Sequence, residues 1–256
     1  MRLNPGLLGK ELREARWKWI IGGGALLVTA LLLPFGFDIL RSFLSDAPPL
    51  PEAWGSLVSS QLGDYTTYLW MNWYGKNLFQ LVVVIAVLLG AAPLAGERSR
   101  RSMEFLLSQP ISRATLFQTK YVAGLALLWS MIIITTLTMG PSSVAAGHSL
   151  DLSRFIRGLP VTLAGAALFY AISWVYSALL GEEIKAVLAG GATCAALIVI
   201  GWIPALRPVS LSHHLAAAQT LQSNDIRWDV TLVLLGLSLV CTGVAWRIFK
   251  IQRTMI

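Results

Sequence analysis

The chain has 256 residues, of which 55% are hydrophobic and only 13% are charged, and its mean hydropathy is +0.66. Soluble domains carry roughly 25% charged residues, which coat the surface that water contacts. This composition excludes an ordinary soluble domain and indicates an integral membrane protein. We therefore interpret the formal net charge of +7 as a signal of topology and predict no nucleic-acid partner.

Residues 1–16 predict an amphipathic helix ahead of the first apolar stretch. Leu8, Leu12 and Ala15 fall on one face, and charged residues surround the other. Such a segment is either an elbow helix that meets a cytoplasmic partner or an anchor that lies on the membrane surface. The segment alone favours neither interpretation.

Six stretches are long and free of Asp, Glu, Lys and Arg, as a helix that crosses the hydrocarbon core requires. They run Trp19–Phe37, Asn77–Gly96, Tyr121–Leu150, Gly158–Gly181, Ala186–Leu206 and Val230–Trp246. The third is over-long, and we expect its helix to end near Gly140–Pro141. The sequence thus predicts one all-α transmembrane domain over residues 1–256, with six spanning helices.

Two longer segments between the spans, 38–74 and 207–229, are predicted to be extracellular and to contain short helices. In the first, residues 53–74 are expected to lie on the outer surface with aromatic side chains among the lipid headgroups. Those side chains are Trp54, Tyr65, Tyr68, Trp70 and Trp73. In the second, Leu211–Gln222 is predicted to form a short helix.

The Lys and Arg residues divide unequally between the two sides of the membrane. One side holds Arg2, Lys10, Arg13, Arg16, Lys18, Arg98, Arg100, Arg101, Arg113, Lys120, Lys185, Arg247, Lys250 and Arg253. The other side holds Arg41, Lys76, Arg154, Arg157, Arg207 and Arg227. The positive-inside rule assigns the richer side, and with it both termini, to the cytoplasm.

The cytoplasmic segment after the second span has a charged first half and an apolar second half. It reads Glu97-Arg98-Ser99-Arg100-Arg101-Ser102-Met103-Glu104-Phe105-Leu106-Leu107-Ser108-Gln109-Pro110-Ile111-Ser112-Arg113. As a helix it places Met103, Leu106 and Leu107 on one side. Such a helix either presents these side chains to a cytoplasmic protein or lies on anionic lipid through its arginines, and the pattern alone favours lipid.

Residues 97–113 resemble the cytoplasmic loop of ABC-2-type permeases, the membrane subunits of many bacterial ATP-binding-cassette exporters. That family has a Glu after the second helix, a basic stretch, Gly-Thr, and then Glu-x-Leu-Leu-Ser-x-Pro-Ile/Val-Ser-Arg. Here the run from Glu104 to Arg113 matches closely, whereas Arg101-Ser102 stands in place of Gly-Thr. Without the glycine, a sharp turn at this point is less favourable. Length, six predicted spans and the amphipathic start extend the resemblance over the chain.

The resemblance implies that residues 97–109 form a coupling helix, which sits in a groove of a separate ATPase subunit and carries its motion to the membrane helices. The implied contact residues are Glu97, Arg98, Arg101, Met103, Glu104, Phe105, Leu106, Leu107 and Ser108. It also implies a second permease copy or a paralogue, since six helices form half of the family's pathway. The implied location is the bacterial inner membrane.

The chain contains no Gly-x-x-x-x-Gly-Lys-Ser/Thr motif, the loop that cradles nucleotide phosphates. We therefore predict a non-enzymatic subunit without a catalytic or cofactor site, and we expect ATP and Mg²⁺ to bind the partner ATPase. We also predict no metal site, because the adjacent His213 and His214 would point about 100° apart on a helix, unlike the i, i+4 pairs that chelate metals.

The middles of the predicted spans contain no Asp, Glu, Lys or Arg. Ion-coupled transporters usually carry such a group near the membrane midplane. The pattern favours an export pathway for an amphipathic, lipid-like or peptidic substrate. The alternatives are a six-helix secondary transporter, and a membrane anchor or sensor that uses an ATPase for signalling.

Overall fold

The computed structural model describes residues 5–45, 64–103, 111–203, 210–215 and 225–251. These residues form helices and their connections, with no strand among them, as the sequence predicts. The helices are α1 (Pro5–Leu32), α2 (Gly36–Ser45), α4 (Tyr65–Asn72), α5 (Leu78–Ser99), α7 (Arg113–Ala145), α8 (Leu152–Ile156), α9 (Leu159–Leu179), α10 (Glu183–Val199), α11 (Leu211–Leu215) and α13 (Trp228–Ile251). Short 3₁₀ turns follow α1 and α10, and a π-helical turn joins α4 to α5.

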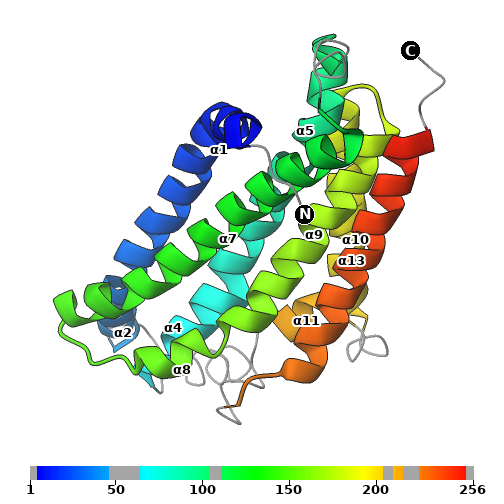
Figure 1. Cartoon of the computed structure of the whole chain (residues 1–256). Helices are drawn as coiled ribbons and strands as arrows, with labels where there is room; N and C mark the ends of the chain where they lie inside the picture. Colours follow the sequence, from blue (N-terminus) through cyan, green and yellow to red (C-terminus); the bar gives the residue numbers. More distant parts are fainter. Residues whose placement is uncertain (1–4, 46–63, 104–110, 204–209, 216–224, 252–256) are drawn as a thin grey trace.

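The long helices run alongside one another as a bundle (Figure 1). The start of α1 and the ends of α5 and α13 lie at one end of it, which we call the loop end because α5 stops there at Ser99 and α7 begins at Arg113. The short helices α2, α8 and α11 lie at the opposite end. Helix α1 is continuous from Pro5 to Leu32, although its first turns are seen end-on in Figure 1 while its later turns run along the bundle.

Five helical stretches in the described part of the chain are long and apolar enough to cross a membrane. They are Pro5–Leu44, Tyr65–Ser99, Arg113–Ala145, Leu152–Leu179 and Trp228–Ile251. The predicted fifth span corresponds to α10, which has 17 residues and continues through the turn Ile200–Trp202. At about 1.5 Å per residue, α10 alone is close to 26 Å long, slightly less than the roughly 30 Å hydrocarbon core.

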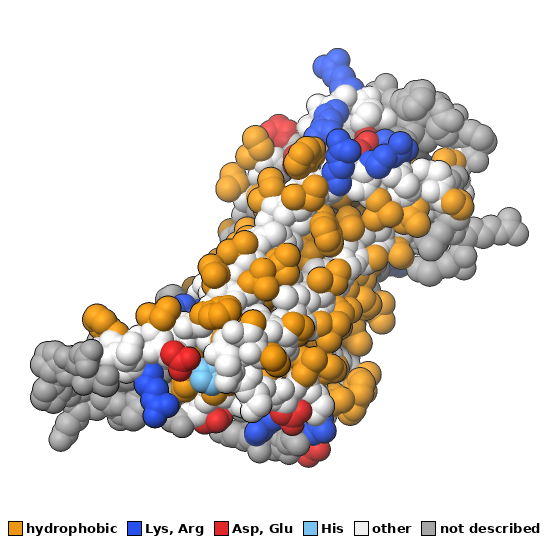
Figure 2. All heavy atoms as spheres, turned by 90° about the vertical axis from the view of Figure 1, so that its left-hand side faces the viewer, with side chains coloured by type: hydrophobic (Ala, Val, Ile, Leu, Met, Phe, Trp, Pro, Cys, Tyr) orange, Lys and Arg blue, Asp and Glu red, His pale blue; other side chains and the backbone are white. Residues whose placement is uncertain are grey.

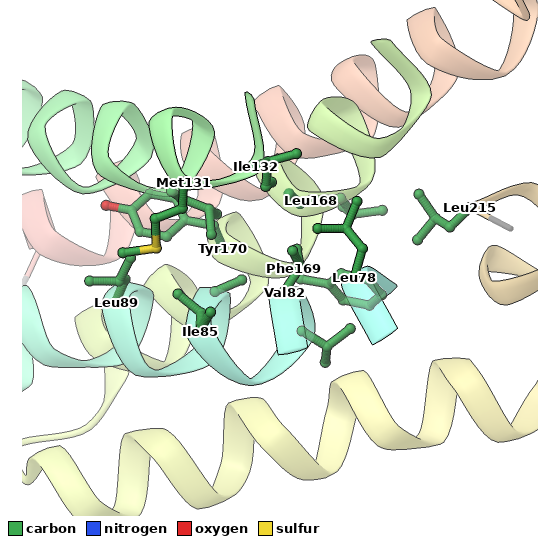
Figure 3. Packing of buried hydrophobic residues seen from close by; sticks show 14 of the residues in the cluster. Leu78, Val82, Ile85, Leu89, Met131, Ile132, Leu168, Phe169, Tyr170 and Leu215 are labelled. Carbon is green, nitrogen blue, oxygen red and sulfur yellow. The ribbon is translucent and has the colours of Figure 1, made fainter. Parts of the chain in front are cut away.

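Helix α9 forms the centre of the bundle. In the helical stretch that contains α9, 72% of an 18-residue apolar segment is buried. The corresponding share is 22% in the stretches that contain α1 and α13. In α9, Phe169 lies beside Leu78 and Val82 of α5, and Tyr170 lies beside Met131 of α7 (Figure 3). The outer helices keep apolar side chains exposed, as expected where lipid or another membrane subunit covers them.

The predicted end of the third span near Gly140–Pro141 is wrong, because α7 runs through Pro141 to Ala145. Neighbouring hydroxyls provide extra hydrogen bonds around the proline. Ser142 Oγ donates to the Thr138 carbonyl at 2.9 Å, and Ser143 Oγ donates to the Met139 carbonyl at 2.7 Å. Membrane helices tolerate proline when side chains satisfy the backbone groups that it disturbs.

The prediction that Tyr65, Tyr68, Trp70 and Trp73 lie among lipid headgroups is also wrong, because the protein core buries all four. The fifth residue of that prediction, Trp54, lies outside the described residues. Helix α4, the π-helical turn and α5 form one continuous helical stretch, so these rings face other helices. Trp73 Nε1 donates to Thr136 Oγ1 at 3.2 Å. Aromatic rings bury more apolar area than other side chains, and inside a bundle they can satisfy their polar atoms as well.

Figure 2 shows hydrophobic side chains over the middle of the molecule on the α1 side, and charged side chains gathered near its two ends. Lys and Arg residues are concentrated at the upper end in that view, which is the loop end. The lengths and apolar belt of these helices fit a multi-pass membrane protein.

Candidate functional site

A buried lysine joins three helices at the loop end. Lys120, in the second turn of α7, is only 2% exposed. Its Nζ lies 2.6 Å from Oε1 of Glu11 in α1 and 3.0 Å from Oε1 of Glu97 near the end of α5. Removing one partner of a buried ion pair typically costs about 3–5 kcal/mol, because the other charge stays buried without compensation. We call Lys120, Glu11 and Glu97 the charged junction.

Further polar groups surround the junction and share its carboxylates. Lys10 Nζ lies 3.3 Å from Oε1 of Glu97, and the Ser102 hydroxyl donates to the other oxygen of the same carboxylate. Glu97 is 8% exposed, and hydrogen bonds to a carboxylate offset part of its cost of burial. Groups from α1, from α7 and from the loop after α5 therefore all contact the Glu97 side chain.

The backbone at the end of α5 makes a sharp turn into the loop. Arg101 has a φ of +56°, in the left-handed region. The Arg101 amide donates to the Arg98 carbonyl and the Ser102 amide donates to the Glu97 carbonyl, both at 3.0 Å. This pair of bonds is a Schellman motif, whose left-handed residue is usually glycine. The turn expected from a glycine at this position is therefore formed with arginine in its place.

We predict that Arg101→Gly stabilises the protein by about 1 kcal/mol, since a left-handed conformation strains residues with a Cβ. For a chain of this size the unfolding Tm in detergent should rise by about 2–4 °C. The matched control is Gly147, which has a φ of +82° at the C-terminal end of α7, where the same pair of bonds forms. Gly147→Arg should lower Tm by a similar amount. A lower Tm for Arg101→Gly would contradict the assignment.

Two more contacts tie the loop end to α9 and α10. Arg98 Nη1 donates to the carbonyl of Ala178 at 2.8 Å, at the end of α9. Lys18 Nζ of α1 lies 3.2 Å from Oε1 of Glu183, the first residue of α10. Glu183 therefore forms an ion pair between α10 and α1.

Helix α5 contains a proline shortly before the loop. Pro93 stands inside it and removes one backbone hydrogen bond. The next two amides, of Leu94 and Ala95, both lie 3.1 Å from Ser177 Oγ of α9, to which they donate. The end of α5 is thus attached to α9 through a side-chain hydroxyl, close to a weakened point of its own helix.

A family model described as ABC-2 family transporter protein matches residues 7–250. The chain belongs to the ABC-2 transporter family. No curated protein and no solved structure was found to match it. The resemblance predicted from residues 97–113 is confirmed, and the chain is a permease component of an ABC transporter.

The structure describes four of the nine residues predicted to contact the ATPase in this ABC-2 permease. Glu97 and Met103 are buried, and Arg98 binds the α9 backbone, so these three side chains face the permease itself. Arg101 is exposed. The remaining five, Glu104, Phe105, Leu106, Leu107 and Ser108, lie outside the described residues.

Sequence reasoning missed the partners of Glu97 in this ABC-2 permease. Lys120 entered only as a positive charge on the cytoplasmic side, and Glu11 was not singled out. The available signal was the position of Lys120, one residue before an apolar span, where an unpaired charge is unfavourable.

Carboxylate oxygens of Glu11, Glu14 and Glu97 lie within 4.8 Å of one another. Ammonium groups contact all three: Lys120 lies against Glu11 and Glu97, and Lys10 lies 3.5 Å from the more exposed Glu14. The structure therefore gives these carboxylates a role in ion pairs.

Proposed function

We propose that this chain is the transmembrane half of an ABC exporter, driven by a separate ATPase subunit that binds the segment 97–109. The observation that carries the proposal is the charged junction. It holds the first residue of that segment, Glu97, against Lys120 of α7 and Glu11 of α1. A movement of the loop would then displace two other helices as well as α5.

The proposed topology has six spans with both termini in the cytoplasm, and α10 is the fifth span. An even number of crossings puts the start of α1 and the end of α13 on the same side, as in Figure 1. Lys and Arg gather at that end (Figure 2), which supports its assignment to the cytoplasm. The membrane would be the bacterial inner membrane.

A second permease, either another copy or a paralogue, would complete the substrate pathway. Of the five stretches long enough to cross a membrane, those that contain α1 and α13 are the least buried. They expose large apolar side chains, for example Ile21, Leu32 and Leu239. Such surfaces suit contact with lipid and with another membrane subunit. ATP and Mg²⁺ would bind the ATPase, and the permease would bring no cofactor.

The proposed transmission is mechanical. Closure of the ATPase would push the 97–109 segment, and the charged junction would pass this displacement to α7 and α1 as rigid bodies. Because Pro93 weakens α5 just before the loop, the last turns of α5 could reorient while the rest of the helix remains packed.

Isolation of the complex tests the proposal. The tagged chain, extracted from its native membrane in mild detergent, should bring a P-loop ATPase with it in a fixed ratio. In proteoliposomes the complex should hydrolyse ATP faster when an amphipathic substrate is present, and ATP should be needed for transport. A substrate-dependent current without ATPase would favour a secondary transporter. Tight ATPase binding without transport of any substrate would favour a sensor.

A further inference from the structure

A pocket of about 310 Å³ lies beside the charged junction, between α1, α5, α7 and the start of α10. This volume is at the lower end of the range for small-ligand sites. Small side chains at the helix faces leave the space, among them Ala15, Ala92 and Gly96. The pocket occupies the loop end of the bundle, at the edge of the apolar belt.

The lining combines an apolar wall with a charged one. Leu89, Pro93 and Leu127 supply apolar surface from within the predicted spans. The charged lining residues are Lys10, Lys18, Arg100 and Lys120 together with Glu11, Glu14, Glu97 and Glu183. Positive and negative groups are equal in number, so a ligand with one charge of each sign suits the pocket better than one with a net charge.

Two of these charged residues remain available to a ligand. Arg100 is exposed, and none of the ion pairs among described residues involves it. Glu14 has a side chain 49% exposed and pairs with Lys10 of its own helix at 3.5 Å, a contact typically worth a few tenths of a kcal/mol. A guanidinium can bind phosphate through two parallel hydrogen bonds, and a carboxylate can accept from an ammonium group.

We propose that this pocket binds the headgroup of a membrane phospholipid that carries a phosphate and a primary ammonium, as in phosphatidylethanolamine. Arg100 binds the phosphate and Glu14 accepts from the ammonium, while Leu89 and Leu127 contact the first acyl methylenes. The location supports a lipid over a soluble ligand, because headgroups lie at the ends of apolar spans. The proposal does not depend on the ATPase partner.

Native mass spectrometry of the detergent-purified chain tests this site with four added compounds: phosphatidylethanolamine, phosphatidylcholine, phosphatidylglycerol and soluble phosphoethanolamine. Phosphatidylethanolamine should bind at least about tenfold more tightly than the other two lipids, the loss expected when one charge-assisted hydrogen bond is missing. It should also bind more tightly than phosphoethanolamine, which lacks the acyl methylenes that contact Leu89 and Leu127. Equal binding of the three lipids would overturn the headgroup assignment. Phosphoethanolamine binding as tightly as the lipid would overturn the membrane source.

Two variants locate the binding in the pocket. Ala92→Phe fills it from α5, and Arg100→Gln removes the phosphate ligand from an exposed position where folding is little affected. Each should reduce phosphatidylethanolamine binding about tenfold, while the control Arg13→Gln, an exposed position on α1 outside the pocket, should not. Unchanged binding in Arg100→Gln refutes the site. None of these outcomes bears on co-purification with an ATPase, so the two proposals fail separately.

Discussion

Replacement of Lys120 by Met is expected to destabilise the protein by about 3–5 kcal/mol and to abolish coupling to the ATPase. The substitution keeps much of the side-chain volume but leaves the carboxylates of Glu11 and Glu97 buried without their main partner. Unfolding in detergent measures the first effect. The ratio of substrate transported to ATP hydrolysed, in proteoliposomes with the ATPase, measures the second.

The effects on stability and on coupling can be separated by also removing the two carboxylates that Lys120→Met leaves without a partner. In the triple variant Lys120→Met, Glu11→Gln, Glu97→Gln, no buried carboxylate lacks a partner, so much of the lost stability should return. Coupling should remain low, since the link between α1, α5 and α7 is still absent. If the triple variant regains full coupling, the junction has only a structural role.

The matched control for Lys120 is Lys185→Met. Lys185 also forms an ion pair, 2.7 Å from Glu182, but its side chain is 63% exposed. Water and salt screen such a pair, so stability should change by no more than about 0.5 kcal/mol. Coupling should be unaffected.

The double substitution Leu106→Asp and Leu107→Asp is expected to release the ATPase. Burial of a leucine in an interface is worth about 1.5–3 kcal/mol, and an aspartate there adds the cost of a desolvated charge. Affinity should fall by at least about a hundredfold. Co-purification of the ATPase with the tagged permease measures this loss, and membrane insertion should be normal because the loop is outside the spans.

Conservative replacement provides the control for this experiment. Leu106→Met with Leu107→Met keeps the apolar surface and should retain the ATPase. Glu104→Lys probes the charged side of the same predicted helix and should weaken binding or uncouple hydrolysis from transport. If the aspartate variant binds and stimulates the ATPase like the unmodified permease, the 97–109 segment is not the contact.

The two outcomes distinguish two parts of the proposed mechanism. The leucine variant should lose the partner, whereas the Lys120 triple variant should keep the partner and lose transmission. If the triple variant also releases the ATPase, the charged junction belongs to the surface that binds the ATPase. The buried position of Lys120 argues for transmission.

The sequence by itself determined the class of protein, most of the spans and the family. Hydropathy and the distribution of Lys and Arg act through sums over each segment, and these sums are the same whatever the helices later pack against. The loop from Glu97 to Arg113 indicated the family because its motif is contiguous and can be recognised from the sequence alone. No knowledge of neighbouring helices was needed for either inference.

Only the tertiary structure decided which charges meet. Lys120 is 109 residues from Glu11 and 23 from Glu97, and their contact depends on which faces α1, α5 and α7 turn toward one another. Packing also explains why Trp70 and Trp73 lie in the core, whereas the sequence predicted them at the membrane surface. Helix faces are chosen by long-range packing and by the cost of burying an unpaired charge, and local pattern does not contain that information.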